Sequence, residues 1–501
     1  MPYARRWLRC CQPSAPQQSF GSIHPLSYDL SNTEELYAAR LRRYVTAMRK
    51  GVPDRVPLRP LAAEITAKYA GYTCQEVTHD YRKAFEAVIR CCADFDWDAV
   101  VPNMVYVWTG LTQAIGLRYY GVPGIDVGAE FGFQYREPAE EDAFMRRAEY
   151  PELIADPTRF LYEKWLPRVT GEVSPAGAAT SYRNNLSFVK GGMAMLRYFT
   201  DFGPQVERMR TECGTVSAIC GMLKAPLDIL ADKLRGYIGL VFDLKEIPET
   251  VLQACQALMP HLAHLALTGA DPQRNVPVPI WMHRGCTPFI SRRHFTEIYW
   301  PTLRPIVEAL WGQGSQVLFY AEGKWDAHLE AFAELPAGSI VYHIDRGDPE
   351  LTHRTLGRKF CLSGGVPNTL LAFGKPDEVK AHCKRLIETI GAEGGYLMDA
   401  SAIIQNDASL ENLKAMTDAT REYGVYRSPS APSVCVPPPA AATGLPAWVT
   451  GAPSPPGVCL PWETKQRELP PIQGDADLVE RVWNDLEGLA YLYIWHVLLS
   501  F

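Results

Sequence analysis

The second half of the chain alternates short apolar segments with helical ones, and this alternation restricts the fold more than any other feature. Apolar runs of strand length lie at residues 278–282, 316–321, 339–344, 360–362 and 395–398. Helical periodicity covers residues 291–312, 325–334, 349–356, 376–390 and 410–423. Continuous apolar strands separated by helices are typical of a parallel sheet that helices cover. Eight such units would close a barrel, so we expect an α/β fold of the (β/α)8 TIM barrel type.

The first half shows the same alternation less regularly. We expect helices at 31–49, 81–94 and 226–267, and strands that end near Leu61, at 97–103 and at 215–220. Residues 130–200 mix acidic turns, proline and helical stretches, which indicates an insertion in the first half of the barrel. We therefore assign residues 31–427 to one barrel domain.

The last part of the chain differs in composition. Ten prolines lie between residues 429 and 461, so we interpret 428–462 as a flexible Pro/Ala-rich linker. Residues 463–501 form a C-terminal helical segment, whose helix is expected from Asp475 onward. Such an apolar face needs a partner surface: packing back on the barrel is the first expectation, and a homodimer contact is the alternative. The face consists of Val479, Val482, Trp483, Leu486, Leu489, Ala490 and Tyr493.

Composition excludes several classes of protein. The chain has 50 Lys and Arg against 56 Asp and Glu, a formal charge of −6, which argues against nucleic-acid binding. No apolar run approaches the ~20 residues that span a membrane. Thirteen scattered cysteines without a CxxC pair indicate reduced thiols and a cytoplasmic protein. Residues 1–30 are expected to be a flexible extension; Arg5, Arg6 and Arg9 with no acid before Asp29 leave a transit peptide as the alternative.

Several motifs resemble the uroporphyrinogen decarboxylase superfamily. These are Ser-Gly-Gly-Val-Pro-Asn-Thr-Leu-Leu-Ala-Phe-Gly-Lys-Pro at 363–376, Gly-Gly-Tyr-Leu at 394–397, Glu-Asn-Leu-Lys-Ala-Met at 411–416, and Phe-Ile-Ser-Arg-Arg-His-Phe-Thr-Glu-Ile-Tyr-Trp-Pro at 289–301. The resemblance covers roughly residues 35–425 and is densest after 280. It implies a TIM barrel with the active site at the carboxyl ends of its strands.

The superfamily has two branches, and the chain departs from both. One holds zinc enzymes that move methyl groups to or from a corrinoid, with a His-x-Cys pair and a further Cys as ligands. Here Tyr320, Glu322 and Ala402 stand at the matching positions, so the thiolate ligands are missing. The other branch, the decarboxylases of haem synthesis, holds substrate carboxylates with an Arg-Gln-Ala-Gly-Arg loop. The matching stretch from Arg59 lacks paired arginines and carries Glu64, although Asp98 or Asp96 matches the catalytic aspartate of that branch.

Polar side chains cluster at predicted strand ends, where a barrel enzyme carries its chemistry. His283 and Arg284 follow one strand, Tyr320 and Glu322 end the next, and His343 and Asp345 end the one after. Residues two apart on a strand face the same way, so these side chains are expected to converge. His283, Glu322, His343 and Asp345 would form a cluster for acid–base catalysis, or His283 and Glu322 would ligate a divalent metal without thiolates.

Further residues are candidates for substrate binding, each with a structural alternative. Asn103 and Glu64 end strands of the first half, and Arg284 could orient an anionic group. Trp108 belongs to an aromatic group with Tyr106, Tyr119 and Tyr120 that could hold a flat substrate or simply fill the core. Ser363 opens a glycine-bearing loop of the kind that binds phosphate, although a tight turn needs glycine equally. A strand-end histidine is likewise often structural.

Three functions follow from these observations. The first is a methyltransferase-like enzyme that demethylates a small substrate, with Glu322 and His283 as acid–base groups and a corrinoid protein as acceptor. The second is decarboxylation of a porphyrinogen or another carboxylated ring, with Asp98 or Asp96 stabilising a protonated intermediate. The third is a barrel that binds a tetrapyrrole or a partner without catalysis. A divalent metal and a corrinoid carried by the partner are the cofactors that these functions imply.

Overall fold

The computed structural model describes residues 30–101, 113–426, 435–442 and 444–500. Its centre is a parallel sheet in the order β10-β9-β8-β7-β6-β5. The strands are β5 (Leu223–Lys224), β6 (Val278–Met282), β7 (Val317–Ala321), β8 (Ile340–Ile344), β9 (Cys361–Gly364) and β10 (Tyr396–Leu397). Five of them agree closely with the predicted strands, because each is an apolar run buried along its whole length.

Two further strands continue the parallel arrangement. β1 (Ala99–Val100) pairs with β4 (Val216–Ser217), and the backbone of Cys220 donates a hydrogen bond to Pro277, just before β6. On the other side, residues 58–62 form parallel bridges to Met398 and Ile404 and bond to residues 98–101. The links run in the order expected of a barrel. The described strands nevertheless make separate sheets, with β2 (Tyr120–Gly121) and β3 (Gln134–Tyr135) as an antiparallel pair apart, so the model supports a parallel α/β fold.

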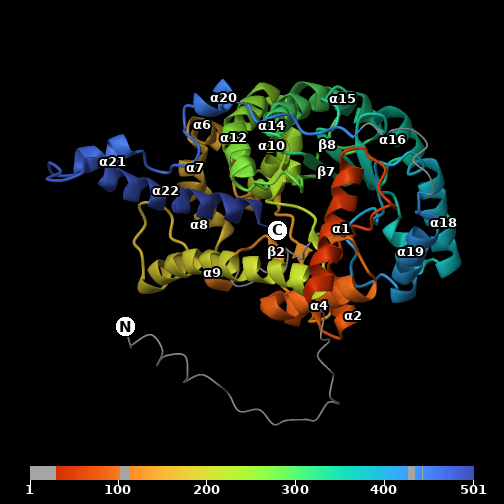
Figure 1. Ribbon diagram of the computed structural model, residues 1–501. Coiled ribbons are helices and arrows are strands. Elements are labelled where there is room, and N and C mark those ends of the chain that lie inside the picture. Colours follow the sequence, from red (N-terminus) through yellow and green to blue (C-terminus); the bar gives the residue numbers. More distant parts are fainter. Residues whose placement is uncertain (1–29, 102–112, 427–434, 443, 501) are drawn as a thin grey trace, which may run out of the picture.

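Helices surround the strands (Figure 1). In the first half these are α1 (Leu30–Met48), α2 (Glu64–Ala70), α3 (Cys74–His79), α4 (Tyr81–Asp94), α6 (Tyr150–Ala155), α7 (Pro157–Phe160), α8 (Leu166–Val169), α9 (Tyr182–Cys213), α10 (Pro226–Ile229), α11 (Tyr237–Glu246) and α12 (Pro248–Thr268). In the second half they are α13 (Arg292–His294), α14 (Trp300–Gly312), α15 (Leu329–Ala333), α16 (Pro349–Leu356), α17 (Asn368–Phe373), α18 (Pro376–Thr389) and α19 (Leu410–Tyr423). The long helix α9 in the predicted insertion was not anticipated.

Helix α1 covers the amino-terminal edge of the sheet. Its Tyr44, Ala47 and Met48 are buried against the inward side chains of the strands, among them Trp281 and Tyr320. The side chain of Gln316, directly before β7, donates a hydrogen bond to the backbone of Met48. A site open to substrate must therefore lie at the opposite, carboxyl edge.

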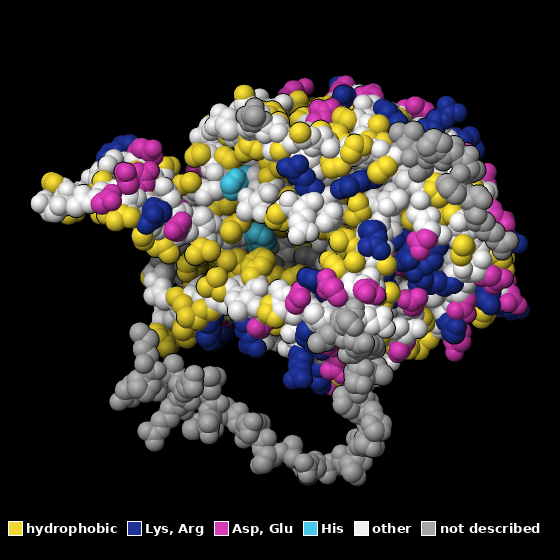
Figure 2. Space-filling model, in the orientation of Figure 1, with side chains coloured by type: hydrophobic (Ala, Val, Ile, Leu, Met, Phe, Trp, Pro, Cys, Tyr) yellow, Lys and Arg dark blue, Asp and Glu magenta, His cyan; other side chains and the backbone are white. Residues whose placement is uncertain are grey.

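The tail packs on the α/β domain, but with a different face from the predicted one. After α20 (Ala447–Thr450) and α21 (Trp462–Glu468), helix α22 (Ala476–Leu499) lies beside α9 in Figure 1. Its last turns are buried, with Tyr491, Trp495 and Leu498 in the core, whereas Val479, Val482, Leu486 and Leu489 of the predicted face are exposed. Hydrophobic side chains gather on this surface in Figure 2.

Part of the predicted linker, residues 435–442, contacts the α/β domain. The backbone of Val436 donates a hydrogen bond to the carbonyl of Arg49, and that of Ala442 donates one to the carbonyl of Gly312. Every described cysteine is a free thiol, and most of them are buried. Among the described helices, none combines the length and apolar character that crossing a bilayer requires.

Candidate active site

A cavity of about 280 Å³ opens at the carboxyl edge of the sheet, and we call it the mouth cavity. Lys224 ends β5, His283 and Arg284 follow β6, and Glu322 follows β7, so parallel strands bring all four to this edge. The remaining lining combines aromatic side chains with charged ones: Ala63, Glu64, Tyr120, Phe133, Tyr135, Asp232, Lys233, Ile403 and Gln405. Of the predicted residues, the structure thus brings Glu64, His283, Arg284 and Glu322 together.

His283 and Glu322 form a pair in this cavity. His283 Nε2 lies 3.5 Å from Glu322 Oε2, and the two side chains keep 22% and 33% of their surface exposed. On its other side, His283 Nδ1 lies 3.1 Å from Asp232 Oδ2 and 3.3 Å from Lys224 Nζ. A carboxylate at Nδ1 favours the tautomer whose Nε2, facing Glu322, can accept a proton. The arrangement can therefore take up or release a proton between His283 and Glu322.

Asp232 organises the basic groups of the cavity. One of its oxygens accepts hydrogen bonds from Lys224 and His283, and the other accepts one from Arg284 Nε at 2.9 Å. Burial alone would raise the pKa of Asp232, but the neighbouring Lys224, His283 and Arg284 hold it well below its usual range. Asp232 is therefore a charged centre that fixes three side chains of the site.

The turn after Glu322 requires glycine. Gly323 has φ +99°, and a Cβ there would lie 2.5 Å from Cys286 Sγ. Its amide donates a hydrogen bond to Asp345 Oδ2 at 2.7 Å. Asp345 does not line the mouth cavity. It faces a second, wider space of about 640 Å³, which we call the outer cleft and which also contacts Arg346, His382 and Arg385. Burial raises the pKa of the Asp345 carboxyl.

Three predicted residues lie below the mouth cavity rather than in it. His343, Tyr320 and Ser363 are fully buried. His343 stacks on Tyr320 at 4.4 Å between ring centroids, and both of its ring nitrogens have polar partners, Ser363 Oγ and the carbonyl of Ser401. Burial and the nearby Arg59 hold the pKa of His343 well below its usual value. Strand alternation correctly predicted that these side chains point inward. They are buried beneath the cavity, however, so the predicted contact with substrate does not follow.

The prediction for Asp98 is corrected more strongly. Asp98 precedes β1 and so lies at the amino-terminal edge, opposite the mouth cavity. It is fully buried, and its carboxylate pairs with Arg43 and Arg55 while accepting a hydrogen bond from the amide of Leu58. It therefore ties α1 and the following turn to the sheet. Asn103 and Trp108 lie outside the described residues.

The predicted metal site does not fit the geometry. Within the described ranges, no three His, Cys, Asp or Glu side chains converge as a metal would need. Glu322 and His283 are adjacent, but Asp232 and Lys224 already occupy the other side of the imidazole. We therefore derive no catalytic step through a metal.

The sequence analysis did not predict three residues that line the mouth cavity: Lys224, Asp232 and Lys233. The strand predicted at 215–220 contains β4, whereas Lys224 ends β5, a separate strand that was not predicted. Predicting β5 would have placed Lys224 at the carboxyl edge. Asp232 and Lys233 come from η6 (Leu230–Leu234), a π-helical turn after α10, which carries no sequence signature comparable with a strand end.

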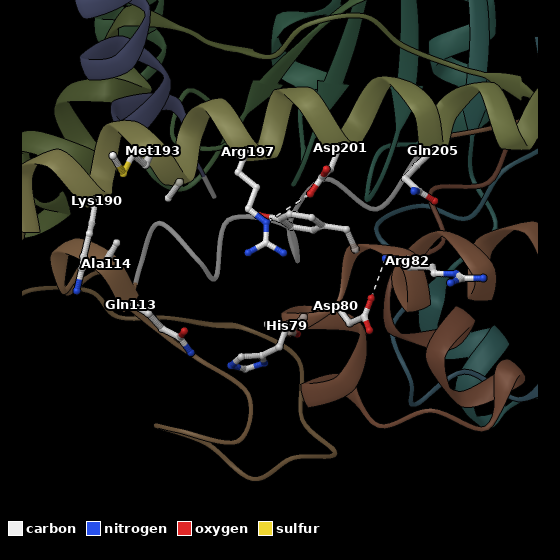
Figure 3. A pocket seen from close by; sticks show the side chains of 13 residues that line it. His79, Asp80, Arg82, Gln113, Ala114, Lys190, Met193, Arg197, Asp201 and Gln205 are labelled. Carbon is white, nitrogen blue, oxygen red and sulfur yellow. Dashed lines mark hydrogen bonds and ion pairs between the residues drawn. The ribbon is translucent and has the colours of Figure 1, made fainter. Parts of the chain in front are cut away.

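A larger cavity, of about 710 Å³, lies elsewhere (Figure 3). His79, Asp80 and Arg82 form one wall, and Lys190, Arg197 and Asp201 of α9 form the other. Arg197 pairs with Asp201, while Asp80 accepts hydrogen bonds from the first amides of α4. These groups serve helix structure, and no strand end is among the described residues that line this cavity, so the smaller mouth cavity is the candidate site.

The layer under the mouth cavity allows a test by pH. Asp399 is fully buried, with Oδ2 3.2 Å from Arg59, and burial raises its pKa to about 7. Since the unfolded value is about 4, the folded protein binds an additional proton between these pH values. The stability contributed by this proton is present below about pH 4 and is lost as the pH rises through 7. We expect Asp399→Asn to flatten the pH dependence of the free energy of unfolding in this range, measured by denaturant titration. An identical slope in both proteins would contradict the assignment.

Fold and site together define a parallel α/β protein with an acid–base pair at the carboxyl edge of its sheet, an arrangement typical of enzymes. Residues 199–423 match the family model described as "Uroporphyrinogen decarboxylase (URO-D)". A uroporphyrinogen decarboxylase of Anaeromyxobacter dehalogenans (strain 2CP-C) is 29% identical over 135 residues, which are 27% of this chain and 38% of that protein. A methyltransferase from Methanosarcina mazei has a similar structure, with a TM-score of 0.51 and 15% identity over 77% of this chain and 98% of its own. The predicted resemblance to the uroporphyrinogen decarboxylase superfamily is thus confirmed over residues 199–423.

Proposed function

We propose that this protein is an enzyme that removes a methyl group from a small anionic substrate in the mouth cavity and passes it to a corrinoid on a partner protein. One observation carries the proposal: Glu322 lines both the mouth cavity and the outer cleft, together with Ile403 and Gln405. A group transfer needs two reactants at one point, and this geometry offers a small compartment for the donor beside a wider approach for the acceptor. The fold similarity to a methyltransferase agrees with this proposal. We further propose that the linked strands close as an eight-stranded barrel, which would make the mouth cavity its opening.

The residues of the cavity have separate tasks. Arg284 and Lys224 surround the anionic group of the substrate, and their pairing with Asp232 holds them in place. When the bond between the methyl group and its heteroatom breaks, the electron pair stays on the heteroatom. The His283–Glu322 pair supplies the proton that this leaving group needs. The aromatic walls of Tyr120, Phe133 and Tyr135 limit access of water.

Decarboxylation of a porphyrinogen receives less support. The mouth cavity, at about 280 Å³, is slightly below the roughly 300–1,000 Å³ that ligand pockets occupy, which is small for a tetrapyrrole. Asp98, the predicted catalytic aspartate, lies at the other edge of the sheet. A homodimer through the exposed apolar residues of α9 and α22, such as Phe188, Leu196, Val482 and Leu486, stays a proposal.

The test uses the full-length protein under anaerobic conditions with free cob(I)alamin as acceptor. Candidate donors are a methoxybenzoate, an N-methylated amino acid and a methylthio carboxylate, each with the unmethylated compound as control. We expect methylcobalamin and a demethylated product with at least one donor. Loss of CO₂ from a donor, seen by mass, would favour a decarboxylase, and binding of donors without either product would favour a barrel without catalysis.

A further inference from the structure

Lys233 is a lysine whose side chain is almost completely buried. It belongs to the π-helical turn η6, whose wider backbone brings both Asp232 and Lys233 to the wall of the mouth cavity. Lys233 is only 1% exposed, so its amine has exchanged water for protein neighbours. Turns of this kind occur frequently at functional sites.

The neighbours of Lys233 accept N–H groups without neutralising a positive charge. Its Nζ donates a hydrogen bond to the carbonyl of Ser500 at 2.8 Å and lies 3.8 Å from the ring centroid of Tyr119. Across the described part of the chain, no carboxylate forms an ion pair with it, whereas Lys224 Nζ lies 2.9 Å from Asp232. Burial, helped by the nearby charge of Lys224, holds the pKa of Lys233 well below its usual value. A neutral amine that donates one N–H to Ser500 retains its lone pair.

We propose that Lys233 is a nucleophile that forms an imine with a small oxo acid, an anionic aldehyde or ketone, bound in the mouth cavity. Three features of the cavity lining support this: a buried amine without an ion-pair partner among the described residues, a second lysine close by, and Arg284 to hold the carboxylate. This inference goes beyond the proposed methyl transfer and does not depend on it. The same cavity would then serve carbonyl chemistry that neither branch of the superfamily resemblance implies.

The step balances without an oxidant or reductant. The amine lone pair attacks the carbonyl carbon, and the carbonyl oxygen takes a proton from the His283–Glu322 pair, which lines the same cavity. The nitrogen returns one proton to that pair, the hydroxyl group takes this proton and leaves as water, and the protonated carbon–nitrogen double bond that remains gives its last N–H proton back to the pair. Water reverses the sequence and returns the free amine and the oxo acid.

The tail of the chain positions this lysine. The hydroxyl of Tyr119 donates a hydrogen bond to the carbonyl of Val497, and Ser500 supplies the carbonyl that Lys233 contacts. The last turns of helix α22 therefore pack next to Lys233, and these are the turns of the helix that are buried.

The test traps the imine in the full-length wild-type protein. The protein is incubated with pyruvate and sodium cyanoborohydride near pH 7, and the reduced adduct is located by peptide mapping. We expect Lys233 to be modified at least about 10-fold faster than exposed lysines such as Lys324 and Lys414, because exposed amines are protonated at this pH. Acetone, which lacks the carboxylate, should label Lys233 more slowly than pyruvate does.

A matched variant separates nucleophilicity from anchoring. Lys233→Arg keeps an N–H donor for Ser500 but cannot form an imine, so it should lose the adduct, whereas Lys324→Arg should keep it. Labelling of Lys224 instead, even labelling of exposed lysines, or no adduct at Lys233 would overturn the proposal and leave Lys233 as an anchor for the tail. Should the Lys233→Arg protein fail to fold, the wild-type peptide map decides alone. No cobalamin is present, so failure here is distinct from failure of the methyl-transfer assay.

Discussion

Replacing Glu322 by Gln is expected to lower the turnover number for methyl transfer by about 10² to 10⁴ while leaving the melting temperature nearly unchanged. The amide keeps the shape of the carboxylate but cannot exchange a proton with His283 Nε2, 3.5 Å away. Stability should change little because Glu322 is one-third exposed and belongs to no buried ion pair in the described structure besides that contact with His283. The measurement is the rate of product formation with free cob(I)alamin, beside a thermal unfolding curve.

A neighbouring carboxylate supplies the control. Asp345 lines the outer cleft rather than the mouth cavity and accepts a hydrogen bond from the amide of Gly323. Asp345→Asn should therefore affect the rate much less than Glu322→Gln does. Full activity of Glu322→Gln together with a large drop in melting temperature would make Glu322 a structural residue, and the proposed acid–base pair would be wrong.

Replacing Asp232 by Ala is expected to lower the free energy of unfolding by about 3–5 kcal/mol. Asp232 contacts three basic side chains at once, so its removal takes one carboxylate away from three positive or protonatable groups, among them Lys224, which is only 2% exposed. Burying an unpaired charge costs far more than losing an exposed pair. Urea denaturation followed by fluorescence measures the change, and the same variant should also lose activity because His283 and Arg284 lose the group that orients them.

Two comparisons make this measurement specific. The double variant Asp232→Ala/Lys224→Met removes both charges and should recover part of the lost stability. Glu297→Gln breaks an exposed pair with Arg293 on one helix and should cost less than about 1 kcal/mol. If Asp232→Ala were no more destabilising than Glu297→Gln, the buried charge cluster would not be the centre that holds the site.

Much of the fold could be predicted from the chain because the signal is local. The strands of the second half are mostly apolar and buried along their whole length, and helices such as α4, α16 and α19 agree with prediction because caps and periodicity mark their ends. Strand ends then located His283, Arg284 and Glu322, since a residue that follows a parallel strand must lie at the carboxyl edge. The long helix α9 escaped prediction because it carries glycines, a proline and exposed apolar residues that blur its period.

How deep a side chain lies below the mouth cavity, and which residues it contacts, depend on the tertiary structure. Alternation along β7 and β8 predicts which face the side chains of Tyr320 and His343 take, because the period of a strand is two. Whether those side chains reach a cavity or a buried layer depends on how far neighbouring strands are shifted along one another, which no local pattern encodes. The same holds for Lys233, whose surroundings come from Tyr119 and from Ser500, 267 residues further along the chain. Sequence period acts over a few residues, whereas burial and charge pairing arise from contacts between distant segments, and these contacts make this group of residues a site.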